Sequence, residues 1–66
     1  MYFVIELQTN NGETANIVTS HATREAAESK YHTILAAAAV SNVAKHAAVI
    51  ISEEGFPIMH QCYIHG

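Results

Sequence analysis

The chain has few of the residues with which small domains are cross-linked. Cys62 is the only cysteine among 66 residues, so no disulfide can form within the chain. A domain of about 60 residues buries only roughly 60% of its unfolded surface, and its stability is marginal unless disulfides, a metal or oligomerisation add to it. We therefore expect a single domain over residues 1–66 that gains stability from a metal or from self-association.

Positive charge is equally scarce. Arg24, Lys30 and Lys45 are the only lysine and arginine residues, and the formal net charge is −3. A surface that binds DNA or long RNA needs several clustered lysines and arginines. Long nucleic acid is therefore not an expected partner.

Export signals and long apolar runs are also missing. Residues 1–9, MYFVIELQT, are apolar over only a few positions and carry no basic flank, unlike a signal peptide. No apolar run approaches the roughly 20 residues that cross a bilayer. With one free cysteine, these features lead us to expect a reducing cytoplasmic location and no membrane partner.

Alternating apolar residues are what the chain does have. Phe3, Ile5 and Leu7 recur at every second position, which is the period of a strand, and the hairpin signal Asn10-Asn11-Gly12 follows. Residues 14–20 then predict a second strand. Residues 45–54 and 56–65 predict two more, joined by a turn at 54–55, with Pro57 at a strand start or an edge.

One helix is expected between these strand pairs. Thr23 is the predicted N-cap, Arg24 starts the helix, and the end is expected near residues 40–42. Residues at helical spacing form one apolar stripe: Ala27, Tyr31, Ile34, Leu35 and Ala38. The sequence thus predicts an α+β fold, a single ββαββ domain whose four-stranded, mainly antiparallel sheet carries one helix on one face.

A single helix leaves the second sheet face uncovered. On an assumed register, that face carries some of Tyr2, Val4, Ala48, Ile50, Met59 and Tyr63. Such a patch exceeds what monomers usually expose, so we expect a homo-oligomer, the alternative being scattered surface apolar residues. The small residues Ser29, Thr33 and Ala37 at helical spacing offer a second contact surface, or simply favour an exposed helix.

Five histidines and Cys62 raise the question of a metal. His60 and Cys62 share a strand face, and Cys62 and His65 have a spacing seen in zinc sites. A structural zinc site takes four ligands, and only one pair is evident, so we expect no metal and no cofactor. Cys62 with a histidine could form a nucleophile pair, but no orienting third residue or glycine-rich loop is present, so we expect no enzyme and no catalytic residues.

Anion binding has a better basis in the sequence. A helix N-terminus offers free N–H groups, and Arg24, Lys45 and His46 could join it where neighbouring chains meet. Tyr31, His32 and Tyr63 could stack on a base. The predicted ligand-binding residues are therefore Arg24, Tyr31, His32, Lys45, His46 and Tyr63. The competing interpretation is structural, with solvated cations, Tyr31 in the core, and His32 paired with Glu28.

Residues 28–57, ESKYHTILAAAAVSNVAKHAAVIISEEGFP, resemble a family of short, largely uncharacterised proteins of phages and prophages of gut Firmicutes. The resemblance carries no catalytic positions. It implies an accessory protein that binds something of the host. One recurrent class of such proteins consists of compact homo-oligomers that sequester cyclic oligonucleotides or cyclic ADP-ribose derivatives used as immune signals.

Three functions are therefore weighed. The first is a non-enzymatic phage accessory protein, homo-oligomeric, that binds a small nucleotide-like ligand between subunits and acts as an anti-defence sponge. The alternative is a protein–protein interaction module that inhibits a host protein through an apolar sheet face. The third is a structural or regulatory phage protein without a ligand.

Overall fold

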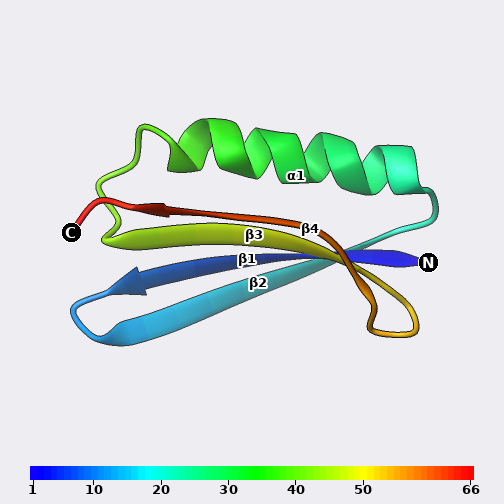
Figure 1. The fold of residues 1–66 in the computed structure, drawn as a ribbon, viewed down its shortest axis with the longest axis horizontal. Coiled ribbons are helices and arrows are strands. Elements are labelled where there is room, and N and C mark those ends of the chain that lie inside the picture. The colour runs from blue at the N-terminus through cyan, green and yellow to red at the C-terminus, as the bar shows by residue number, and fades with distance from the viewer.

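Four strands and one helix make up the computed structural model, which describes all residues from Met1 to Gly66. The elements are β1 (Tyr2–Asn10), β2 (Glu13–His21), α1 (Arg24–Ala38), β3 (Lys45–Ser52) and β4 (Pro57–Ile64). All neighbouring strands pair antiparallel in one sheet of order β2-β1-β3-β4, and α1 lies along one side of it (Figure 1). The predicted ββαββ order and the four-stranded antiparallel sheet are confirmed.

The β1–β2 hairpin turns at the predicted position. Asn11 and Gly12 have φ angles of 54° and 80°, as a two-residue type I′ turn requires at both central positions. Asn and Gly tolerate this left-handed conformation better than other residues. The turn sets the register, which runs from Asn10 opposite Glu13 to Tyr2 opposite His21.

Helix α1 begins as predicted and ends earlier than predicted. Ala26 donates its backbone N–H to Thr23 Oγ1 at 3.2 Å, so Thr23 is the N-cap. The helix ends at Ala38 rather than near residues 40–42, and Ser41 Oγ and His65 Nε2 both donate to the Ala38 carbonyl. These side chains satisfy a helix-end acceptor from outside the helix. No helix of the protein has the length and apolar character needed to cross a membrane.

The core lies between α1 and the two central strands, β1 and β3. Its six residues are Val4, Ala27, Tyr31, Ile34, Ala48 and Ile50, with Tyr2, Leu35, Ile58 and Met59 packed against them. The predicted helical stripe is confirmed, because Ala27, Tyr31, Ile34 and Ala38 are buried and Leu35 is partly buried.

The face predicted to be uncovered is the wrong one. Val4, Ala48 and Ile50 lie beneath α1 together with Tyr2 and Met59, and Tyr63, which pairs with His46, shares their side of the sheet. Both alternate sets of side chains in β1 and β3 contain large apolar residues, Val4 and Ile50 in one set and Ile5 and Val49 in the other, so period two by itself does not select the side that meets the helix. The small Ala48 leaves room for the bulky side chains that α1 brings to this side.

Candidate functional site

The side of the sheet away from α1, called here the open face, carries a continuous apolar surface. Because Val4 and Ile50 point towards the helix, their neighbours along each strand point the other way. Cross-strand pairs of β1 and β3 form the centre of the open face: Phe3 with Ile51, Ile5 with Val49, and Leu7 with Ala47. All six are partly exposed. The sheet thus has apolar side chains on both faces, and the helix covers one of them.

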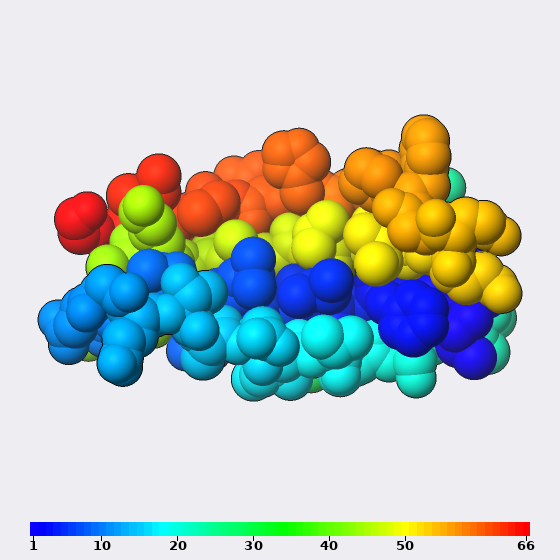
Figure 2. Space-filling view, turned by 90° about the horizontal axis from the view of Figure 1, so that it is seen from below, coloured from blue at the N-terminus to red at the C-terminus, as the bar shows by residue number.

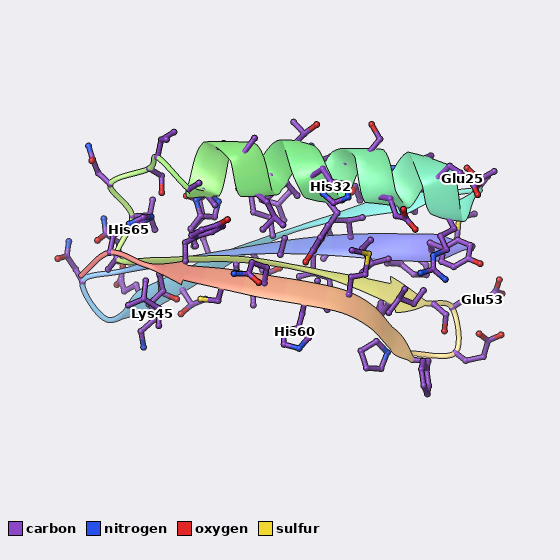
Figure 3. All side chains as sticks on the ribbon, turned by 45° about the horizontal axis from the view of Figure 1, so that its top comes forward. Glu25, His32, Lys45, Glu53, His60 and His65 are labelled. Atoms are coloured by element: carbon purple, nitrogen blue, oxygen red, sulfur yellow. The ribbon has the colours of Figure 1, made fainter.

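The open face is broad and nearly uncharged. The molecule measures 33 × 20 × 15 Å, with the strands along the longest axis and the helix stacked on the sheet across the second (Figure 1). The open face therefore extends about 33 by 15 Å. Figure 2 looks onto it, with β1 and β3 between the outer strands β2 and β4. Lys45 and His60 project from this side, away from the helix, near its margins (Figure 3).

A polar network lies on the opposite, helix-facing side. His46 is only 4% exposed, and its Nε2 donates to Glu6 Oε2 at 2.6 Å. Gln8 donates to the same carboxylate oxygen at 2.9 Å, and His46 Nδ1 lies 3.2 Å from Ser41 Oγ. Burial alone would raise the pKa of Glu6, but the hydrogen bonds from His46 and Gln8, together with the charges of His46 and Lys30, lower it below its ordinary value.

The line of Ser41, His46 and Glu6 has the residue types of a nucleophile, a base and an orienting carboxylate. Its surroundings do not favour acyl transfer. Ser41 follows the C-terminus of α1, where carbonyl oxygens rather than N–H groups are free, and its hydroxyl donates to Ala38 O. A developing oxyanion would meet acceptors there instead of donors. The hydrogen bonds of these three residues instead join β1, β3 and the end of α1.

The six predicted ligand-binding residues are divided among several places. Arg24 lies at the start of α1 and Lys45 at the start of β3, at opposite ends of the molecule (Figure 1). Arg24 Nε is 2.8 Å from Glu28 Oε2, so Glu28 pairs with Arg24 and not with His32 as the structural interpretation expected. Tyr31 and His46 are buried, 3% and 4% exposed, and offer little surface to a ligand. Within one chain the two cations do not converge.

Aromatic rings meet in two pairs, one on α1 and one at the end of β4. Tyr31 and His32 meet edge to face at 5.4 Å, and Tyr63 and His65 stack with centroids 6.3 Å apart and planes 5° apart. Burial raises the pKa of Tyr31, and the charge of Tyr63 raises it further. Figure 3 shows His32 on the helix and His65 past the end of β4. Of these four residues, His32 and His65 are exposed.

One shallow hollow of about 320 Å³ lies near the β1–β2 turn. It is lined by Gln8, Asn10, Glu13, Thr14, Ala15 and Val43. It contains a carboxylate and no cation, and none of the six predicted ligand-binding residues lines it. The hollow therefore does not suit a phosphate.

No three histidine, cysteine, aspartate or glutamate side chains gather closely enough to hold a metal ion together. Cys62 is an exposed free thiol on the open face, and the His60 side chain lies on the same face. His65 instead turns to the helix end and donates to Ala38 O. His60 and Cys62 therefore share a strand face as predicted, whereas His65 lies apart from Cys62.

Glu6 and Ser41 were not among the residues predicted from the sequence. One feature of the sequence could have revealed Glu6. It lies two residues after Val4, on the same face of β1, so a strand face that packs in the core also carries a charged side chain. Such a group needs a buried partner, and His46, opposite Gln8 in the register, provides it.

Comparisons with protein-family models, curated proteins and solved structures find no match for this chain.

Proposed function

We propose that the protein is a non-enzymatic protein–protein interaction module whose working surface is the open face. The observation that carries this proposal is the unbroken set of cross-strand apolar pairs at its centre, among them Ile5 with Val49. A strand that is apolar on both faces is ordinarily covered on both faces, and β3 is covered on one. Contiguous exposed apolar surface of this kind marks interaction sites.

The resemblance to phage-encoded proteins supports a host protein as the partner and inhibition as the outcome. The face itself supports a partner recognised by apolar contact, because its centre carries no charge. A flat surface of this size has the scale of a small, specific interface rather than of a ligand pocket.

The test compares Val49→Lys and Ile5→Lys with Thr33→Lys, which places the same charge on the exposed side of α1. Immobilised proteins are exposed to lysate of a gut Firmicute, each retained protein is identified, and binding is remeasured with the purified pair. We expect one protein to bind the wild type and Thr33→Lys, and to bind the two open-face variants about tenfold more weakly or worse. The proposal fails if nothing binds in purified form, or if Val49→Lys binds as well as the wild type.

We also propose a second candidate, the sequestration of a small nucleotide-like ligand between subunits. The exposed rings of His32 and His65 support it, because bases stack on exposed rings at about 1–3 kcal/mol each. Since Arg24 and Lys45 lie at opposite ends of one chain, the two cations could meet at one site only if one of them came from a neighbouring copy.

A thermal-shift panel of cyclic oligonucleotides and cyclic ADP-ribose derivatives tests the second candidate. A ligand at about 100 times its dissociation constant stabilises by about 2.7 kcal/mol, which in a domain this small raises Tm by on the order of 10 °C. His32→Ala should reduce the shift, whereas Thr33→Ala should not. A panel without any shift removes this candidate and leaves the interaction module unaffected.

A further inference from the structure

β2 is an edge strand that is open along its whole length. It stands at the end of the order β2-β1-β3-β4, and seven of its nine residues are exposed. Helix α1 packs mainly on β3 and β1 and leaves most of β2 clear. An edge strand presents a row of unpaired N–H and C=O groups that can pair with another strand.

β2 lacks the features that normally prevent such pairing. It has no lysine, proline or bulge, its only acidic or basic residue apart from His21 is Glu13, and Ile17 and Val18 at its centre are 52% and 55% exposed. The other edge, β4, starts at Pro57 and its pairing with β3 is shifted at Ile50/Ile51. Proline and bulges both protect an edge. Of the two edges, β2 is therefore the one suited to pairing.

The hairpin turn defines which backbone groups of β2 are free. In a two-residue turn the N–H of Glu13 bonds the carbonyl of Asn10, so Glu13 is bonded towards β1. Antiparallel pairs alternate between bonded and non-bonded positions. The outward-pointing N–H and C=O groups therefore belong to Thr14, Asn16, Val18 and Ser20.

We propose that two copies of the chain pair antiparallel through β2, centred on Ile17, and form one continuous eight-stranded sheet. In this register the outward groups of Asn16 meet those of Val18 of the second copy, and those of Thr14 meet Ser20. Ile17 packs against its counterpart at a non-bonded position, where side chains approach most closely.

Complementary polar groups at the two ends of β2 select a second copy as the occupant. When Ile17 faces Ile17, Glu13 at one end of β2 lies opposite His21 at the other end of the partner strand, and the two-fold axis repeats this contact. All nine residues are matched. Strand addition by an unrelated peptide would leave Glu13 and His21 without this reciprocity. The pairing also places the open faces of both copies on the same side of the joined sheet. It therefore doubles the proposed interaction surface and uses none of the residues at the centre of that surface.

Charge reversal tests the register. His21→Glu places two carboxylates opposite each other, and Glu13→Lys removes the carboxylate that His21 meets. Each change acts twice per dimer and should raise the dimer dissociation constant about tenfold. A mixture of the two variants should pair with nearly wild-type affinity, because the lysine introduced at position 13 of one chain then faces the glutamate introduced at position 21 of the other. Glu54→Lys, the same change at an exposed turn residue, is the control. Sedimentation velocity at several concentrations provides the dissociation constants.

Asn16→Pro tests the edge itself. It removes an outward N–H and leaves the bonds to β1 intact, so the variant should be a folded monomer with a wild-type circular dichroism spectrum. If this variant does not fold, the charge-reversal mixture still decides. The proposal is overturned if the wild type stays monomeric at a protein concentration of about 100 times a micromolar dissociation constant. It is also overturned if the mixture of Glu13→Lys and His21→Glu fails to pair. We expect Val49→Lys to leave the β2 dimer intact. A dimer that is lost in Val49→Lys but kept in Asn16→Pro would join the open faces instead, and would also overturn the proposal.

Discussion

At the scale of single residues, the polar contacts beneath α1 matter more than their number indicates. His46 is the only buried residue that is not apolar, and it links Glu6 of β1 to Ser41 after the helix. No buried side-chain nitrogen or oxygen lacks a hydrogen-bond partner. A buried polar group whose partners are all present specifies one arrangement of its surroundings, because losing one partner is costly.

Glu6→Gln should lower the free energy of unfolding at pH 7 by about 1.5–3 kcal/mol, the range for a hydrogen bond to a charged group. The pKa of Glu6 is below its ordinary value of 4.5 in the folded protein, so ionisation stabilises the fold. That stabilisation is complete above the ordinary value and is lost as the pH falls through the folded pKa. Urea unfolding from about pH 7 to about pH 3 should show the difference between wild type and variant shrinking on acidification. Glu54→Gln is the control, and an equal pH dependence in all three proteins would contradict the prediction.

At the scale of elements, α1 shows which helix boundary is local. Its start depends on Thr23 and the residues that follow, so the sequence predicts it. Its end depends on Ser41 and His65, and His65 lies 27 residues away from the carbonyl it caps. Tertiary contact therefore decides the end of α1, and periodicity alone placed it too late.

Thr23→Ala should lower the free energy of unfolding by about 1 kcal/mol, within the roughly 0.5–2 kcal/mol found for lost N-caps. The cause is the loss of the acceptor for the Ala26 N–H. Thr23→Ser retains the oxygen and should stay close to the wild type. Thr33→Ala, whose hydroxyl bonds the Ser29 carbonyl on the exposed side of the helix, should change stability by less than about 0.5 kcal/mol. Chemical denaturation measures all three, and equal losses for Thr23→Ala and Thr33→Ala would refute the capping role.

At the scale of the whole molecule, the decisive feature is the side of the sheet that the helix occupies. Only eight of 66 residues are buried, so the core is one thin layer between α1 and the sheet. The apolar residues of the open face form no core within a single chain. A chain of this size with so small a core is marginal alone, which agrees with the proposed pairing of copies.

Ile50→Lys and Val49→Lys, adjacent in β3, should therefore behave differently. Ile50 is fully buried, and an unpaired charge there should prevent folding. Val49 is partly exposed on the open face, and its lysine can reach water, so that variant should fold. Circular dichroism and amide chemical-shift dispersion separate the two outcomes. A folded Ile50→Lys with an unfolded Val49→Lys would mean that α1 covers the other side.

The amino-acid sequence by itself determined the elements of this protein, because strand alternation, the Asn11-Gly12 turn and the Thr23 cap act over a few residues. It also determined that apolar surface would exceed what one helix covers. Only the tertiary structure decided which face that is, since both phases of β1 and β3 contain large apolar residues and the choice depends on how Ala48 and the Glu6–His46 pair fit beneath α1. Arg24 and Lys45 lie apart because α1 begins at Arg24 and β3 begins at Lys45, beyond the far end of the helix.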